Sequence, residues 1–96
     1  MIEIVLQPAA ITDLAEIEEF SFHRFGSAVA AEYMAKLERA FDRLAEYPES
    51  GPNYPDIRPP VCFTRSGRHY IFYDYDGASL SVIRILHHAR VPEDLL

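Results

Sequence analysis

The sequence Gly67-Arg68-His69-Tyr70-Ile71-Phe72-Tyr73 decides the fold together with Val82-Ile83-Arg84-Ile85-Leu86-His87. Both are apolar, strand-like runs into which charged or imidazole side chains are set. Asp76-Gly77 lies between them, and this dipeptide tolerates the positive φ angles of a two-residue turn. We therefore predict that the two runs form an antiparallel β-hairpin.

Length and composition predict one small domain. The chain has 96 residues, of which 49% are hydrophobic, enough to build one core and no more. It begins with neither a basic leader nor a long apolar segment, and no run reaches the roughly 18 apolar residues that cross a bilayer. The single cysteine, Cys62, cannot form an internal disulfide and is interpreted as a small strand hydrophobe. We expect a soluble cytoplasmic protein with no membrane partner.

The charge is unevenly distributed along the chain. The net charge is −6, and residues 1–50 carry ten acidic and four basic side chains, whereas residues 51–96 carry five of each. Such a balance argues against affinity for the phosphate backbone of nucleic acids. Any anionic partner would meet the second half, whose cations are Arg58, Arg65, Arg68, Arg84 and Arg90.

The first half is predicted to be a short strand followed by two helices. Ile2 to Leu6 forms the strand, and Pro8 suits the first position of a helix that ends before Gly26. A second helix is expected from Ser27 to about Glu46. With so short a turn between them, the helices should form an antiparallel hairpin.

The second half is predicted to be a fixed loop and three strands. Five of the seven prolines lie from Pro48 to Pro60, a composition that supports neither helix nor strand pairing. Strands are expected at 61–65, 68–74 and 79–87. The predicted fold class is α+β in the order β-α-α-β-β-β, an antiparallel sheet with the N-terminal helical hairpin packed on one face.

The predicted hairpin register assigns side chains to two faces of the sheet. With Asp76-Gly77 as the turn, Tyr73 opposes Leu80, Ile71 opposes Val82 and His69 opposes Arg84. Val61, Phe63, Tyr70, Phe72, Ile83 and Ile85 would then form the more apolar face, which we assign to the helix-covered core. The face that carries His69, Tyr73 and Arg84 is expected to remain open at this register.

Arg84 and His69 are the candidate functional residues of that open face. Arg84 lies between Val82 and Leu86 and requires water or an anion, so it either contacts a partner or bridges to a neighbour such as Asp74. His69 is either a general acid or base, or a hydrogen-bonded structural residue. His87 and His88 should point to opposite faces, which argues against a shared metal. The sequence contains no recognisable nucleophile motif or phosphate loop.

Four segments in order resemble the ParE branch of the RelE/ParE toxin superfamily across nearly the whole chain: residues 8–17, Pro48-x-x-Gly51, residues 67–73 and residues 83–90. The resemblance implies a RelE/ParE-like fold and a toxin of a type II toxin–antitoxin module, neutralised by a ParD-like antitoxin. ParE-like members are associated with inhibition of DNA gyrase, and RelE-like members cut messenger RNA on the ribosome. Of the basic residues of the RelE-like branch, only Arg84 finds a clear match, and Cys62 stands where arginine is often found.

We therefore expect a gyrase inhibitor that acts by binding, without catalytic residues, cofactor or metal, and without sequence-specific nucleic-acid binding. Two alternatives stay open: a RelE-like ribosome-dependent endoribonuclease that uses Arg84 for phosphate stabilisation and His69 as proton carrier, and a degenerate relative that binds only its antitoxin. The predicted target-binding residues are His69, Tyr73, Arg84, His87, Arg90, Leu95 and Leu96. The predicted antitoxin-binding residues are Phe20, Phe22, Phe25 and Tyr33.

Overall fold

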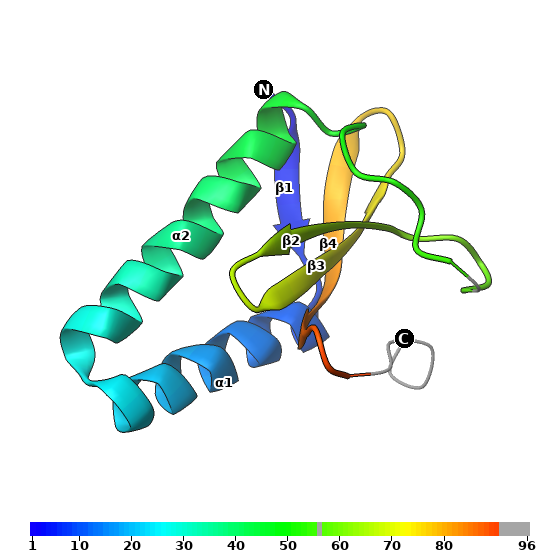
Figure 1. The fold of residues 1–96 in the computed structure, drawn as a ribbon. Helices are drawn as coiled ribbons and strands as arrows, with labels where there is room; N and C mark the ends of the chain where they lie inside the picture. Colours follow the sequence, from blue (N-terminus) through cyan, green and yellow to red (C-terminus); the bar gives the residue numbers. More distant parts are fainter. Residues whose placement is uncertain (56, 91–96) are drawn as a thin grey trace.

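A computed structural model describes residues 1–55 and 57–90 and shows the expected order of elements (Figure 1). The elements are strand β1 (Glu3–Leu6), helices α1 (Pro8–Phe25) and α2 (Ser27–Glu46), and strands β2 (Cys62–Ser66), β3 (His69–Tyr75) and β4 (Ser79–His87). The predicted helix boundaries at Pro8, Gly26, Ser27 and Glu46 are confirmed. Within the described part of the chain, no helix is both long and apolar enough to span a bilayer.

The four strands form one sheet in the order β1-β4-β3-β2. β2, β3 and β4 are antiparallel neighbours as predicted, whereas β1 runs parallel to β4, so the sheet is mixed at this edge. The chain enters α1 almost directly after β1, and α1 packs over β4. This connection places β1 beside β4, and the Gln7 N–H extends the contact by donating to the Val82 carbonyl at 2.9 Å.

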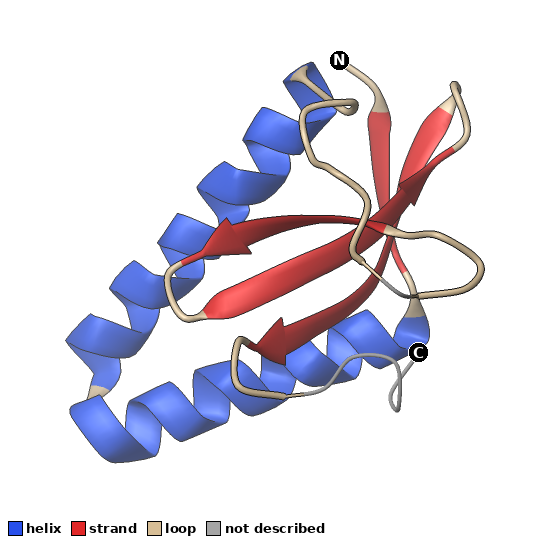
Figure 2. Cartoon of the chain, turned by 45° about the vertical axis from the view of Figure 1, so that its right-hand side comes forward, coloured by secondary structure: helices blue, strands red, loops and turns tan. Residues whose placement is uncertain are grey.

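The two helices meet at Gly26 and diverge from there in an open V (Figures 1 and 2). Each helix buries only one narrow stripe. On α2 the buried residues Ala30, Leu37 and Leu44 recur every seven residues, which places them on one side of the helix. The stripe of α1 is the set Ala10, Asp13, Ile17 and Ser21. The sheet lies within the V, so both helices cover the same face.

Both faces of the sheet are buried, and the predicted assignment of faces is wrong. The helix-covered core contains Ile71, Tyr73, Leu80, Val82 and Ile85. The opposite face carries Phe72 and Leu86, which pack against Ile57 and Val61 of the proline-rich segment. The predicted core face is thus covered by this segment, except for Ile85, and the face predicted to be open lies under the helices.

The register of the β3–β4 hairpin also differs from the prediction. Asp76 is not a central turn residue: its carboxylate accepts the N–H groups of Ala78 and Ser79, each at 2.8 Å, and the turn is centred one residue later. Tyr73 therefore pairs with Val82. A bulge at Ile83 then shifts the ladder by one more residue, so that Ile71 pairs with Ile85 and His69 with His87.

Candidate functional site

A groove of about 330 Å³ lies between α1 and the far end of the β3–β4 hairpin. It joins residues of both predicted sets, since Phe20 stands across from His69, His87 and Arg90. Ile17 and Ile85 form its apolar floor, and Asp13 and Glu16 reach it from α1. In this groove, predicted target-binding and antitoxin-binding side chains line a common cavity.

Arg84 forms a bidentate ion pair with Asp13 beside this groove. Its Nε donates to Asp13 Oδ2 at 2.8 Å and a terminal nitrogen donates to Oδ1 at 2.9 Å. The Ile85 N–H donates to the same Oδ2 at 2.9 Å, which ties α1 to the main chain of β4. Only 18% of the Arg84 side chain and 6% of the Asp13 side chain are exposed. The hydrogen bonds that Arg84 donates to the Asp13 carboxylate raise the pKa of Arg84 above its already high ordinary value.

The predicted open position of Arg84 is therefore wrong, and so is Asp74 as its bridging partner. The alternative interpretation, that Arg84 pairs with a carboxylate of the protein, is confirmed, and that carboxylate belongs to Asp13. Asp13 was not predicted as the partner of Arg84. Its spacing of three residues from Ala10 and four from Ile17 puts it on the buried stripe of α1, and that spacing is the signal that could have identified it.

His69 is held by Tyr33 rather than presented to solvent. Its Nδ1 lies 2.6 Å from the Tyr33 hydroxyl oxygen, which also accepts the Arg68 N–H at 3.0 Å. We assign the hydroxyl proton to the short contact, so that Nδ1 accepts it and the imidazole is neutral. Burial, followed by the neighbouring His87 and His88, lowers the pKa of His69 to about 4. This places a hydrogen-bonded structural histidine at the head of the groove.

His87 and His88 do not point to opposite faces as predicted. β4 ends at His87, and the two rings stack with their centroids 4.4 Å apart. Burial and then His87 lower the pKa of His88. In residues 1–55 and 57–90, no three histidine, cysteine or carboxylate side chains come together as a metal site.

Comparison with known proteins decides the family. Residues 4–92 match the family described as the ParE toxin of the type II toxin–antitoxin system parDE. The chain belongs to the ParE toxin family. Toxin ParE1 of Mycobacterium tuberculosis is 36% identical over 84 residues, 86% of either chain, in both strains compared. Toxin ParE1 of Caulobacter vibrioides is 33% identical over 82 residues, covering 85% of this chain and 84% of that toxin.

The fold of this ParE chain also has a solved counterpart. A structure described as the chromosomal ParDE TA system from P. aeruginosa contains a chain that superposes with a TM-score of 0.78. The match covers 91% of this chain and 96% of the other at 17% sequence identity. At that identity, the likeness shows a shared fold.

Tyr73 cannot be a target-binding residue of this ParE toxin in the conformation described. It is completely buried, and its hydroxyl accepts the Gly51 N–H at 2.9 Å, so it ties the proline-rich segment to β3. Burial raises the pKa of the Tyr73 phenol. The prediction placed it on an open face, and it failed because that face is covered by the helices.

The remaining predicted residues fall into four groups. His87 is half-buried and Arg90 is exposed at the rim of the groove. Leu95 and Leu96 lie outside the described residues. Phe20, Phe22 and Phe25 are 65%, 51% and 58% exposed, and Val29 at the start of α2 is 49% exposed. Tyr33 is half-buried, and its hydroxyl group is hydrogen-bonded to Nδ1 of His69.

Proposed function

We propose that this ParE-family toxin inhibits DNA gyrase by binding to it, without breaking bonds, and that a cognate ParD-like antitoxin neutralises it in the cytoplasm. Membership of the ParE family supports the choice of gyrase. The Asp13–Arg84 ion pair supports the absence of catalysis, and it is the observation that carries the proposal.

The nuclease alternative requires Arg84 to face a phosphate and His69 to carry a proton. Arg84 already has its charge matched by a buried carboxylate in a bidentate arrangement. His69 has its Nδ1 engaged by Tyr33 and a pKa of about 4, so it is neutral at physiological pH. A reaction that needed both groups would first have to break two partly buried contacts, which argues against this mechanism.

The groove between α1 and β4 suits contact with a protein. Its walls are largely apolar, with exposed Phe20 on one side and the Arg90 cation at the rim. Aromatic and arginine side chains beside an apolar floor are typical of residues that dominate protein–protein binding. We therefore place the gyrase contact at Phe20, His87 and Arg90, and leave Tyr73 and Arg84 out of it.

A supercoiling assay with purified gyrase tests the proposal. The toxin should block supercoiling, and Phe20→Ala with Arg90→Ala should reduce its potency at least about tenfold, the loss expected for removing two anchor residues. Tyr47→Ala is the matched control, since Tyr47 is 59% exposed at the end of α2 and away from the groove.

Two outcomes would contradict this function. Unimpaired supercoiling at excess toxin would leave a relative that binds only its antitoxin. Codon-positioned cuts in messenger RNA after induction, mapped by primer extension, would identify a ribosome-dependent endoribonuclease.

We further propose that the antitoxin covers the aromatic surface at the junction of α1 and α2. Phe22 and Phe25 lie one helical turn apart and remain more than half exposed, next to Val29. Phe22→Ser with Phe25→Ser should weaken antitoxin binding at least about tenfold by calorimetry, because burying aromatic side chains dominates such contacts. Ile11→Ser is the control, since Ile11 is 54% exposed near the opposite end of α1. An equal effect of both changes would contradict the assignment.

A further inference from the structure

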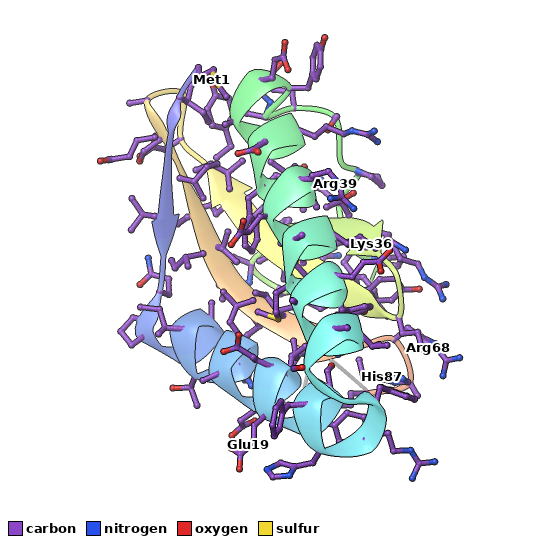
Figure 3. The ribbon with its side chains drawn as sticks, turned by 90° about the vertical axis from the view of Figure 1, so that its left-hand side faces the viewer. Met1, Glu19, Lys36, Arg39, Arg68 and His87 are labelled. Atoms are coloured by element: carbon purple, nitrogen blue, oxygen red, sulfur yellow. The ribbon has the colours of Figure 1, made fainter. Side chains whose placement is uncertain are left out.

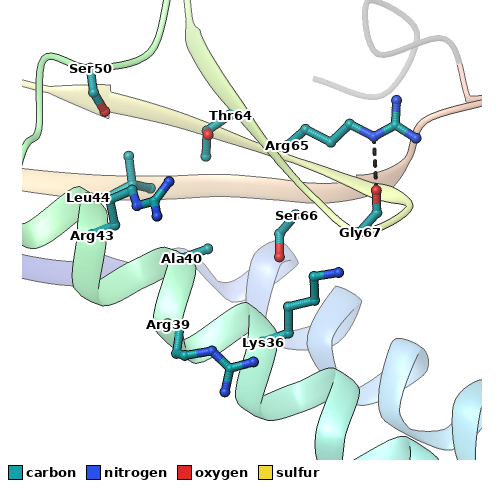
Figure 4. Close-up of a pocket in the computed structure, with 10 residues that line it drawn as sticks. All are labelled: Lys36, Arg39, Ala40, Arg43, Leu44, Ser50, Thr64, Arg65, Ser66 and Gly67. Atoms are coloured by element: carbon teal, nitrogen blue, oxygen red, sulfur yellow. Dashed lines mark hydrogen bonds between the residues drawn. The ribbon is translucent and has the colours of Figure 1, made fainter.

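A second groove separates α2 from the edge strand β2 (Figure 4). Its volume is about 330 Å³, and it shares no lining residue with the groove beneath Phe20. Lys36, Arg39 and Arg43 line it from α2, and Arg65 lies across from them on β2. Four of the chain's nine lysine and arginine residues therefore border one cavity in a protein whose net charge is −6.

The acidic side chains near these cations lie outside the groove, since Glu32 lines a neighbouring cavity together with Lys36 and Arg39. No carboxylate of the described residues lines the groove itself. Within residues 1–55 and 57–90, none of the four takes part in an ion pair. Arg65 donates from its Nε to the Gly67 carbonyl at 2.9 Å, and its guanidinium lies over the Tyr70 ring, on the face of the sheet turned away from α2. Lys36, Arg39 and Arg43 are three and four residues apart, so they follow one flank of α2, where Figure 3 shows Lys36 and Arg39.

The main chain of β2 adds hydrogen-bonding groups to this groove. β2 is the outer strand of the sheet. The Phe63 N–H points outward and donates to the Pro52 carbonyl at 3.0 Å. Because main-chain groups alternate along a strand, the N–H and carbonyl of Arg65 also point away from β3. Among the described residues they have no main-chain partner, and Arg65 is one of the residues that line the groove.

We propose that this basic groove, formed by Lys36, Arg39, Arg43 and Arg65, binds an acidic, extended segment of a partner polypeptide. Lys36, Arg39 and Arg43 would face its carboxylates, and the outward main chain of Arg65 would pair with its backbone. A nucleic acid would also meet these cations. It is the less favoured occupant because the chain as a whole repels phosphate, and because free strand-edge groups recognise a peptide backbone.

The test uses a fluorescent decapeptide of alternating glutamate and threonine, with a glutamine-for-glutamate peptide and oligothymidylate as comparison probes. The full-length toxin should bind the glutamate peptide, more weakly as salt rises, and should prefer it to both other probes. Lys36→Gln with Arg39→Gln should raise its dissociation constant about fivefold, as expected for losing two partly exposed ion pairs.

Arg24→Gln with Arg58→Gln is the matched control, since it removes the same charge from exposed sites outside the groove. This control should leave peptide affinity within about twofold, and circular dichroism should confirm that both variants are folded. The inference is overturned by equal losses in the two variants, by tighter binding of oligothymidylate, or by no binding of the glutamate peptide. In the last case the cations serve only to keep the strand edge solvated. Gyrase inhibition is scored separately, so the two proposals can fail independently.

Discussion

At the scale of single residues, two polar pairs fix the geometry of the groove. Asp13 joins α1 to β4 through Arg84 and the Ile85 N–H, and Tyr33 joins α2 to β3 through His69. Both contacts connect residues more than 30 positions apart in the chain and lie beside the helix-covered core. Each therefore couples a helix of the V to the sheet.

The Asp13–Arg84 pair should contribute strongly to stability. Asp13→Asn removes the carboxylate charge from a largely buried bidentate ion pair, so we expect a loss of about 3 kcal/mol in the free energy of unfolding. Urea denaturation measures it. Asp42→Asn, an exposed carboxylate of α2, is the control and should change stability by less than about 0.5 kcal/mol. A loss as small as the control's would show that the pair is dispensable.

His69 should make stability depend on pH. Its pKa is about 4 in the folded protein, below the ordinary 6.5, so the unfolded chain binds the proton more tightly. The resulting stabilisation is complete above pH 6.5, is lost as the pH falls toward 4, and is constant below that. Because the ring is only partly buried, we expect roughly 2 kcal/mol across this window, less than the full pKa difference implies.

NMR titration of the imidazole gives the midpoint directly, and urea denaturation at several pH values gives the stability. His69→Gln should flatten the profile between pH 6.5 and 4. His23→Gln should not, since the His23 side chain is 70% exposed. A His69 midpoint near 6.5 would contradict the burial and hydrogen bonding described.

At the scale of elements, the two hairpin turns position the strands and one of them also supports the site. The β2–β3 turn contains Gly67 at φ +59°, and the β3–β4 turn contains Gly77 at φ +93°. Both are in the left-handed region that disfavours other residues. Only Gly67 has a neighbour: a Cβ there would lie 2.7 Å from the Tyr33 hydroxyl oxygen, whereas Gly77 faces open space.

Alanine at these glycines separates backbone strain from contact with Tyr33. Gly77→Ala should lower the free energy of unfolding by about 1 kcal/mol through backbone strain alone. Gly67→Ala should cost more, because Tyr33 must move, and it should displace the His69 titration midpoint upward as the 2.6 Å contact is disturbed. Denaturation and NMR titration of both variants check this. Equal losses of unfolding free energy in the two variants, with an unchanged His69 titration midpoint, would mean that Tyr33 moves aside without a loss of stability.

At the scale of the whole molecule, apolar surface collects where the V of the helices closes. Phe22, Phe25 and Val29 are each about half exposed or more at this junction. Apolar groups gathered in this way favour association. The exposed carboxylates Glu16, Glu18 and Glu19 of α1 and the basic groove beside α2 lie on different parts of the same small chain, so the surface offers partners three distinct chemistries.

The free toxin should therefore self-associate. Light scattering of the purified protein should show concentration-dependent association, and Phe22→Ser with Phe25→Ser should shift it toward the monomer. Ile11→Ser, which removes an exposed apolar side chain elsewhere on α1, should have little effect. A monodisperse wild-type toxin at high concentration would contradict this expectation.

The order of the elements and the ends of the two helices could be predicted from the sequence, because these depend on local chemistry, whereas the predicted ends of β1, β2 and β3 were off by one residue. Pro8 and Gly26 bound the first helix, five prolines exclude regular structure between Pro48 and Pro60, and alternating apolar runs mark the strands. The ParE resemblance followed from segments in the same order. The sequence also gathers Phe20, Phe22 and Phe25 near one turn, and all three are exposed in the structure, while their contact with an antitoxin stays a prediction.

Only the tertiary structure decided which face of the sheet the helices cover and what Arg84 contacts. Both faces are apolar, so alternation along the strands could not distinguish the face under the helices from the face under the proline-rich segment. The side chain of Asp76 moved the turn by one residue, and the bulge at Ile83 added another shift. Pairing over 71 positions, as between Asp13 and Arg84, depends on how the elements pack and leaves no local pattern in the chain.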